Sequence, residues 1–537
     1  MSFMKQNVEG LWLPLLHAHL PFVKHPEYEY FLEEQWLFEA ISESYIPLLM
    51  NMKKLLDDSI DFRLTISLSP PLLEMLSDEH LMDKYISYLD RLINFSVKEI
   101  KRLKGDVAFR SLAGFYNIRY AEIKAFYLEF LNRDVVSAFK HFNKLGKIEI
   151  ITSCATHGLL PLLSVNPLSV EAQIRIAVDA HYKLFGQSTK GIWLPECAYY
   201  EGLDRLLAKY GIRFFFLDSH GLMHGSPAPR YGVYAPVYTD SGIAAFGRDM
   251  QSSRQVWSAE EGYPGDWYYR DFYRDAGFDL DFDYIKPYIS PDGNRVFTGI
   301  KYHRITGKGD HKEPYDPVKA MDRAKMHARH FCTEREKQLQ ALGMLMDRPP
   351  VVVSPYDAEL FGHWWFEGPD FLYYVFREMN KRTLIHACTP SEYLKSCPQN
   401  QVISPCPTSW GDKGYYDPWL NKENDWMYRH IHHMAKKMEN LAGKYVNETD
   451  DINVRCLKQL SRELLLAQSS DWAFLITTET AKEYSIKRLK EHIGNFNMLH
   501  EALESGKVDE VQLEMIERKN SIFGELDFRV YSNLETS

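Results

Sequence analysis

Residues 191–200 read GIWLPECAYY, a short apolar run that ends in a single carboxylate, Glu196. A strand that enters a hydrophobic core normally ends in residues that complete the core. Burying an unpaired carboxylate there costs on the order of several kcal/mol. An acid at this strand end therefore needs a partner or a chemical use, and other strand ends along the chain indicate which.

The stretch 191–196 is one of several short apolar runs that alternate with longer helical patterns up to about residue 400. The alternation predicts an α/β fold with a parallel sheet, and its length fits a closed barrel of seven strands. In such barrels the chemistry gathers at the carboxyl ends of the strands. The predicted strands are 11–17, 62–68, 147–153, 191–196, 213–218, 351–355 and 383–387.

Two regions depart from this alternation. Residues 225–310 are rich in Gly, Pro, Asp and Tyr, which predicts a long insertion over the barrel mouth rather than further strand and helix units. From about residue 405 the pattern becomes helical and amphipathic. We therefore expect a catalytic barrel over 1–400 that carries the inserted segment 225–310, and a C-terminal helical domain over 405–537.

Composition restricts the classes of partner. The formal net charge of -10 disfavours nucleic acid, because phosphate binding relies on clustered Lys and Arg. The seven cysteines lack a CxxC pair, and the chain shows neither a signal-peptide pattern at its start nor a membrane-length apolar run. We expect a soluble cytoplasmic protein that needs no cofactor and no membrane, and either a monomer or a homodimer is compatible with the sequence.

Aromatic residues make up 14% of the chain. They indicate either a large aromatic core or a surface that stacks flat, weakly polar ligands such as sugar rings. Three tryptophans fall in one bend, TSWGDKGYYDPWLNKENDW, where they either wedge the helical domain onto the barrel or face a cleft. The three are Trp410, Trp419 and Trp426.

His17 and His19 form an HxH pattern at the end of the first predicted strand, and the period of two places both on one face. They could close the strand, bind substrate, or hold a metal. A catalytic zinc needs a third protein ligand and an open position, and His157 in SCATHGLL could supply that ligand.

Two further acids, Asp357 and Glu359, follow the sixth predicted strand in SPYDAELFGHWW. Two carboxyl groups from separate strands at one barrel mouth suit glycoside hydrolysis, in which one acts as nucleophile and the other as general acid and base. Spacing alone leaves either Asp357 or Glu359 as the partner of Glu196. Each acid could also cap the helix that follows it. Arg248, in FGRD, could contact a ligand or form a structural ion pair with Asp249.

Five stretches in order, HAHLPF, EIITSCATHG, WLPECAY, SPYDAELFGHWW and SSDWAF, resemble the motif regions of glycoside hydrolase family 57, and within it the 1,4-α-glucan branching enzymes. The match runs from about residue 11 to 475. The resemblance implies a distorted (β/α)7 barrel with an inserted lid and an all-helical C-terminal domain that completes the cleft.

By the same resemblance, Glu196 takes the place of the nucleophile and Asp357 that of the general acid and base, with no metal. Either Trp257 or Trp267 would be a further substrate-facing tryptophan, and a mobile loop over the cleft would carry Tyr231 and Tyr234. The other residues that the resemblance or their position marks as substrate-binding are His17, His19, Trp36, His157, Arg248, Trp410, Trp419 and Asp471.

The implied activity is cleavage of α-1,4 bonds in amylose-like or glycogen-like glucan and transfer of the chain to a 6-hydroxyl. A 4-α-glucanotransferase or α-amylase of the same family would keep both acids without forming branches. A metal-dependent hydrolase or deacetylase would instead use His17, His19 and His157, and a non-catalytic protein would only bind glucan.

Overall fold

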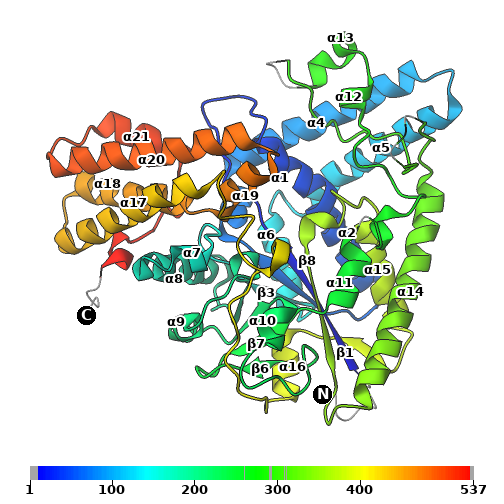
Figure 1. Cartoon of the computed structure of the whole chain (residues 1–537). Helices are drawn as coiled ribbons and strands as arrows, with labels where there is room; N and C mark the ends of the chain where they lie inside the picture. Colours follow the sequence, from blue (N-terminus) through cyan, green and yellow to red (C-terminus); the bar gives the residue numbers. More distant parts are fainter. Residues whose placement is uncertain (1–9, 259, 290–292, 308, 310, 533–537) are drawn as a thin grey trace.

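Parallel strands run through the centre of the molecule (Figure 1). The computed structural model describes residues 10–258, 260–289, 293–307, 309 and 311–532. A first sheet has the order β3-β2-β1-β8, and β9 pairs with the first residues of β1. Its strands are β1 (Gly10–Ala18), β2 (Leu64–Leu68), β3 (Ile148–Ile151), β8 (Val351–Asp357) and β9 (Ile385–Ala387).

A second sheet has the order β4-β5-β7-β6, in which only β6 runs antiparallel. Its strands are β4 (Gly191–Ile192), β5 (Phe214–Leu217), β6 (Val237–Tyr238) and β7 (Ala244–Gly247). Two contacts join the sheets: a parallel bridge between Thr152 and Ile192, and a hydrogen bond of 2.8 Å from Asp249 N to Val353 O. Seven parallel strands therefore follow one another as β8-β1-β2-β3-β4-β5-β7, divided between two ladders.

Alternate residues of these strands share one buried interior. Leu11, Leu13 and Leu15 of β1 belong to the same apolar cluster as Phe214 of β5 and Val353 of β8. Because side chains alternate along a strand, the next position on this face of β1 is His17, and His19 follows just beyond the strand end. The sequence thus places apolar side chains along the first part of the strands and polar side chains where the strands end.

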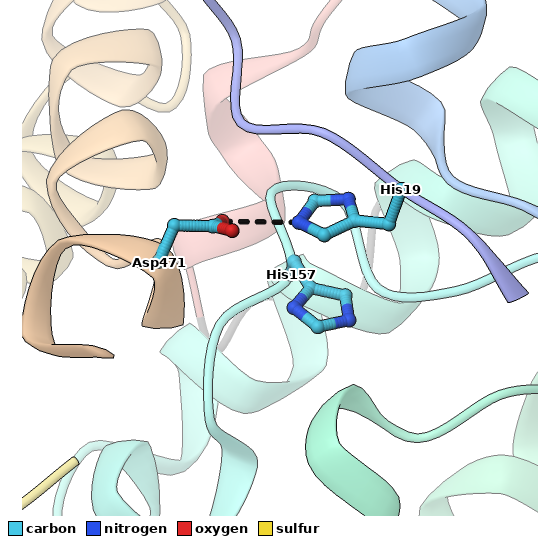
Figure 2. Close-up of side chains that lie close together, drawn as sticks. All are labelled: His19, His157 and Asp471. Carbon is cyan, nitrogen blue, oxygen red and sulfur yellow. Dashed lines mark hydrogen bonds and ion pairs between the residues drawn. The ribbon is translucent and has the colours of Figure 1, made fainter. Parts of the chain in front are cut away.

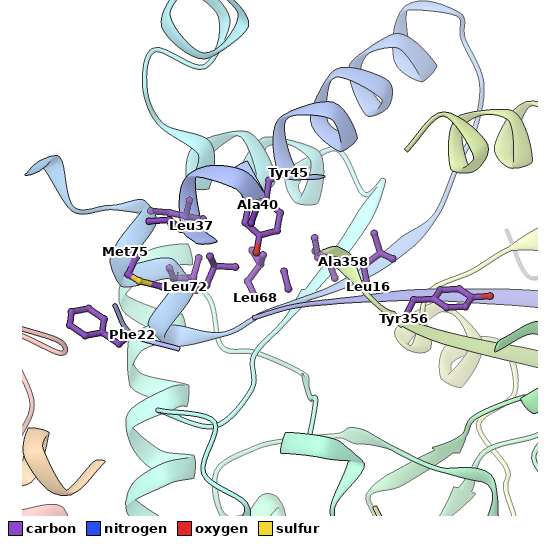
Figure 3. Close-up of a cluster of buried hydrophobic side chains, with 14 of the residues drawn as sticks. Leu16, Phe22, Leu37, Ala40, Tyr45, Leu68, Leu72, Met75, Tyr356 and Ala358 are labelled. Carbon is purple, nitrogen blue, oxygen red and sulfur yellow. The ribbon is translucent and has the colours of Figure 1, made fainter. Parts of the chain in front are cut away.

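The opposite face of the strands packs against helices, which explains why all nine residues of β1 are buried. Figure 3 shows Leu16 of β1 and Leu68 of β2 in one cluster with Leu72 of α3, together with Leu37 of α1 and Tyr45. Apolar side chains on both faces are typical of parallel sheets covered by helices.

Helices follow the strands along the chain, and the polar residues before them explain several of their starts. Asp316 accepts hydrogen bonds from the Val318 and Lys319 backbone, and Pro317 takes the first helical position of α14. The helices up to residue 400 are α1 (Glu34–Ala40), α2 (Ile46–Asp57), α3 (Pro70–Leu76), α4 (Glu79–Arg102), α5 (Val107–Ala125), α6 (Val135–Lys144), α7 (Leu160–Leu163), α8 (Pro167–Phe185), α9 (Leu203–Lys209), α10 (Ser219–Met223), α11 (Met250–Trp257), α12 (Ala276–Asp279), α13 (Phe282–Ile285), α14 (Pro317–Gly343), α15 (Gly368–Met379) and α16 (Pro390–Ser396).

The C-terminal part is helical, and its longer helices stack beside the sheets (Figure 1). The short helix α19 reaches the strand ends: Ser470 N donates to His157 O over 3.1 Å, and Ser469 forms a bridge with Gly158. This helix lies between two predicted amphipathic stretches and was not predicted from the sequence. The five helices are α17 (Asp425–Lys444), α18 (Asp451–Ala467), α19 (Ser470–Thr478), α20 (Lys482–Glu504) and α21 (Glu510–Lys519).

All seven predicted strand regions contain strands, but segment 225–310 differs from the expectation. It holds β7, which pairs in parallel with β5, and α11, whose Ser252 hydroxyl lies 2.7 Å from that of Ser354 in β8. The first part of the segment therefore adds a strand to the second sheet and a helix beside β8, and is no insertion. The short AAFG strand follows a Gly- and Pro-rich stretch, which hid it in the sequence. In the described part of the chain, none of the helices combines the length and apolarity needed to cross a membrane.

Candidate active site

The HxH pattern of β1 lies beside an SxS pattern of β2. His17 is the register partner of Ser67, and its Nδ1 lies 3.2 Å from the Ser67 hydroxyl. Two residues on, His19 Nδ1 lies 2.8 Å from the Ser69 hydroxyl. Parallel register and the period of two thus give each histidine a serine that orients its ring.

His157 joins these two rings from the loop after β3, where its backbone has a φ of 58°. Its Nε2 lies 3.0 Å from His17 Nε2, and its Nδ1 lies 3.0 Å from the Ser470 hydroxyl of α19. Its ring also stacks on His19 with centroids 3.8 Å apart. Burial lowers the pKa of both His17 and His157 well below the usual value, so both rings are neutral at neutral pH.

His19 forms an ion pair with Asp471 of α19, shown by the dashed line in Figure 2. The distance between His19 Nε2 and Asp471 Oδ2 is 3.0 Å. Burial alone would raise the pKa of Asp471, but the charge and hydrogen bond of His19 outweigh it and lower the pKa to about 2. The pKa of His19 is raised in return, since Asp471 overcomes the effect of burial. The three histidines therefore differ: the pKa of His19 is raised by its ion pair, whereas burial lowers the pKa of His17 and His157.

Glu196 lies at the end of the β4 run, and both of its oxygens accept hydrogen bonds. Trp410 Nε1 donates to Oε2 over 2.8 Å, and the Ser470 hydroxyl donates to Oε1 over 3.1 Å. Burial raises the pKa of Glu196 to about 7, with the negative charges of Asp471 and Asp357 acting in the same direction. The two donors oppose this shift by stabilising the charged form.

The backbone at Glu196 is left-handed, which is rare for residues other than glycine. Glu196 has a φ of 61°, and Cys197 has a φ of 52°. Such conformations cost on the order of 1 to 3 kcal/mol each and persist only where the surroundings hold them. Trp410 N donates to Glu196 O over 2.9 Å, so the loop that supplies the side-chain donor also fixes the turn.

Asp357 ends β8 and is the register partner of His17. Burial raises the pKa of Asp357 to about 7, and the nearby charge of Glu359 adds to the rise. Glu359 accepts a hydrogen bond from the Tyr45 hydroxyl and one of 3.3 Å from His19 N. Among the described residues, the Asp357 carboxyl group has no hydrogen-bond donor. Sequence spacing left Asp357 and Glu359 equivalent, but the structure separates them. Hydrogen bonds hold the carboxylate of Glu359, whereas that of Asp357 is free to exchange a proton.

Arg248 lies on the same side of the site. Its Nη1 is 3.2 Å from Asp218 Oδ2, its Nε donates to the Ser253 hydroxyl over 3.0 Å, and its guanidinium lies 5.7 Å from the Trp410 ring centre. Its partner is thus Asp218 and not the adjacent Asp249. The charge of Arg248 lowers the pKa of Asp357, in opposition to burial.

The predicted substrate-facing tryptophans fall into three groups. Trp410 contacts Glu196, and Trp36 of α1 is half-buried against Tyr484. Trp257 and Trp267 are 48% and 65% exposed, without a contact to either acid among the described residues. The prediction for Trp419 is wrong, because its side chain is 1% exposed. It packs beneath the backbone of Gly411, where it supports the Trp410 loop.

The predicted flap is at the wrong end of the sheet to cover the acids. Val351 N, at the start of β8, donates to Tyr234 O over 2.9 Å, whereas Asp357 ends the same strand. Six residues of strand separate the two ends by about 20 Å. Tyr231 lies between the guanidinium groups of Arg230 and Arg348. The expectation that these tyrosines close over the cleft is therefore corrected: Pro and Gly around tyrosine indicate a turn, but not the end of the barrel at which it lies.

The histidines also permit a test of the metal hypothesis. Among the described residues, the ligand atoms of His19, His157 and Asp471 lie within 4.8 Å of one another, so this trio has the spacing of a metal site, and not the His17, His19 and His157 set of the metal alternative. Both ring nitrogens of each of these histidines already have hydrogen-bond partners. The residues therefore fit a closed hydrogen-bond network better than a metal.

Sequence reasoning missed several residues of the site. Ser67 and Ser69 could have been found, because their SxS spacing in a neighbouring strand matches the HxH of β1. Ser470 stands next to Asp471 in the SSDWAF stretch, but nothing in this stretch reveals that it bonds to an acid 274 positions away. Tyr45 gives no signal within its helix.

Comparisons with known proteins agree on one family. The sequence model of glycosyl hydrolase family 57 matches residues 15–405, and the model of the C-terminal domain of 1,4-alpha-glucan branching enzymes matches residues 430–531. A 1,4-alpha-glucan branching enzyme of Thermococcus kodakarensis is 34% identical over 552 residues, covering 96% of this chain and 78% of that relative.

Two solved structures cover nearly the whole fold. The α-amylase AmyC of Thermotoga maritima has 46% sequence identity and a TM-score of 0.91, covering 97% of this chain and 99% of that one. A branching enzyme of Pyrococcus horikoshii has 34% identity and a TM-score of 0.89, covering 99% of this chain and 98% of that one.

Proposed function

Because the chain belongs to glycosyl hydrolase family 57, we propose that it is a retaining 1,4-α-glucan branching enzyme acting on amylose-like or glycogen-like chains. One observation supports this most. The region that matches the branching-enzyme C-terminal model contains α19, and α19 supplies the Ser470 donor to Glu196 and the Asp471 partner of His19. The region that matches the branching-enzyme C-terminal model thus contributes side chains to the site of the acids.

In the first step, Glu196 attacks the anomeric carbon of an α-1,4 bond while Asp357 gives its proton to the departing glycosidic oxygen. The product is a covalent glycosyl ester of Glu196 with inverted configuration. In the second step, Asp357 takes the proton of an acceptor 6-hydroxyl, and the acceptor oxygen displaces Glu196. Two inversions give net retention and an α-1,6 bond.

The hydrogen bonds support this division of roles. The two donors to Glu196 favour its charged form, which a nucleophile needs. Asp357 has burial and the charge of Glu359 to keep its proton, which a general acid needs. The pKa of each group is raised to about 7, so the environment, and not the value alone, separates the two roles.

We further propose that residues 1–400 form the catalytic domain and that the helices after residue 405 complete the cleft. We assign the sugar contacts to residues that the sequence resemblance marks as substrate-binding. Besides the two acids, the proposed set is His17, His19, Trp36, His157, Arg248, Trp410 and Asp471. The choice between Trp257 and Trp267 stays open, since both are exposed.

Hydrolysis is the second candidate, and its basis is the 46% identity to an α-amylase structure. The same acids would serve, with water in place of the acceptor sugar. Branching and hydrolysis therefore differ only in what reaches the glycosyl ester first.

Linkage analysis separates these candidates. Amylose is incubated with the protein, and the new α-1,6 bonds are compared with the new reducing ends, using the Glu196→Gln variant as a blank. Branching predicts α-1,6 bonds in clear excess over reducing ends. Reducing ends without α-1,6 bonds would establish the amylase instead.

A further inference from the structure

A line of hydrogen bonds leads from Glu196 to the far side of β2. Its atoms are consecutive neighbours: Glu196 Oε1, the Ser470 hydroxyl at 3.1 Å, and His157 Nδ1 at a further 3.0 Å. His157 Nε2 then lies 3.0 Å from His17 Nε2, and His17 Nδ1 lies 3.2 Å from the hydroxyl of the last member. We call the line the serine–histidine chain: Ser470, His157, His17 and Ser67.

The serine–histidine chain is closed to water. Each of its four side chains is at most 3% exposed. Its far end has one further acceptor, the carbonyl oxygen of Thr152, at 3.4 Å from the Ser67 hydroxyl. In such a dry interior each donor must point at an acceptor within the chain, because an unmade hydrogen bond is expensive.

Proton counting gives the chain a single direction when Glu196 is charged. A carboxylate only accepts, so Ser470 donates to it and must accept from His157 Nδ1–H. Neutral His157 then has a bare Nε2, which accepts from His17 Nε2–H. Neutral His17 in turn has a bare Nδ1, which accepts the hydroxyl proton of Ser67.

The direction reverses when Glu196 is protonated. A protonated Glu196 donates to Ser470, whose hydroxyl then donates to a bare His157 Nδ1. His157 Nε2–H donates to His17, and His17 Nδ1–H donates to Ser67. The Ser67 proton turns to the Thr152 carbonyl, and every donor remains satisfied.

We propose that the serine–histidine chain is a positioning device for the nucleophile, which turns all its donors toward Glu196 when that carboxylate is charged and reverses as a unit when it is protonated. Ser470 is the positioning residue that contacts Glu196. The inference rests on the proposed function, in which Glu196 is the nucleophile. The glycosyl ester has no proton on Glu196 and its oxygens still only accept, so the serine–histidine chain keeps its direction in the ester and reverses only on protonation.

Other charges also act on Glu196, and the chain must be separated from them. Asp471 of α19 and Asp357 of β8 raise its pKa, while Trp410 donates a hydrogen bond that lowers it. His19, just after β1, is a further titratable neighbour, and the negative charges of Asp471 and Glu196 raise its pKa against the effect of burial. None of these groups belongs to the serine–histidine chain, so they remain when the hydroxyl of Ser470 or Ser67 is removed.

The first test is the pH dependence of kcat/KM on amylose for Ser470→Ala. Loss of a hydrogen bond to a charged group should move the acidic limb upward by about one pH unit. Ser470→Thr, which keeps the hydroxyl, should restore the limb. Ser67→Ala, which does not touch Glu196, should shift it in the same direction by less.

Thr478→Ala is the matched control. Thr478 lies on the same helix, and its exposed hydroxyl donates to the Phe474 carbonyl and accepts a hydrogen bond from the Thr480 hydroxyl. Its removal should leave the profile unchanged. A Ser470→Ala limb within about 0.2 unit of that control would overturn the proposal.

The second test needs no glucan, so it remains decisive if the proposed activity fails. Nitrogen-15 NMR of the histidines, assigned with His17→Gln and His157→Gln, reports which nitrogen of each ring carries the proton. Above the pKa of Glu196, His157 should be protonated at Nδ1 and His17 at Nε2, and both should exchange on acidification. Tautomers that do not change across this range, or His157 protonated at Nε2 at high pH, would contradict the chain.

Discussion

At the scale of single residues, the site depends on two carboxyl groups that have similar pKa values but different neighbours. Glu196 is held by two donors in a left-handed turn, whereas Asp357 stands free at the end of β8. A motif reveals that both acids are present. It does not reveal their donors, because Trp410 and Ser470 lie more than two hundred positions from Glu196 in the sequence.

This pairing predicts a bell-shaped pH profile centred near pH 7. Glu196 must be ionised, so kcat/KM rises with pH through its pKa, and Asp357 must be protonated, so kcat/KM falls through its own pKa. Both values are raised to about 7, which makes the profile narrow. Rates on amylose from pH 4 to 10 measure it.

A glucosyl fluoride tests the assignment of the two limbs. Fluoride leaves without protonation, so the alkaline limb should disappear from the rate of fluoride release while the acidic limb remains. Loss of the acidic limb instead would exchange the roles of the two acids.

At the scale of elements, regular strands were predictable and short or irregular pieces were not. The apolar runs at 11–17 and 351–355 lie within β1 and β8, since burial on both faces leaves a continuous apolar signal. The four-residue β7 and the nine-residue α19 carry too little pattern, and their places are set by tertiary contacts. The loop around Tyr231 shows the same limit, because its composition indicates a turn but not a location.

The corrected location changes the prediction for that loop. Replacing Tyr231 and Tyr234 by Ala should leave the ratio of α-1,6 bonds to reducing ends unchanged, because both lie at the start of β8, away from the acids. The variant should lose roughly 1 to 3 kcal/mol of unfolding free energy, since two half-buried rings lose their packing. Denaturant unfolding and linkage analysis measure the two quantities, and a changed ratio at full stability would return the loop to the cleft.

At the scale of the whole molecule, three distant parts of the chain make one site. β1 and β2 supply the histidines and their serines, the loops after β3 and β4 supply His157 and Glu196, and α19 arrives from the C-terminal helices. The order of the motifs indicated the family, and the comparisons confirm it. The position of α19 beside Glu196 and His19 depends on long-range packing, which no local sequence pattern predicts.

The hydrogen-bond network of this site also predicts that chelators leave the activity unchanged. The nitrogens of His17, His19 and His157 are engaged in hydrogen bonds, so EDTA dialysis should leave branching within about twofold of the untreated protein. Elemental analysis of the active protein gives the control. One zinc per chain, with activity lost on its removal and restored on its return, would favour the metallohydrolase.

The central claim is a double displacement through an ester of Glu196, and trapping that ester tests it most directly. The protein is incubated with a 5-fluoro-α-glucosyl fluoride, which forms the ester faster than it releases it, then digested and analysed by mass spectrometry. We predict one added fluoroglucosyl group on the peptide that contains Glu196, and none in Glu196→Gln. A label on Asp357 or Glu359, or turnover of the fluoride with inversion and no label, would contradict the account.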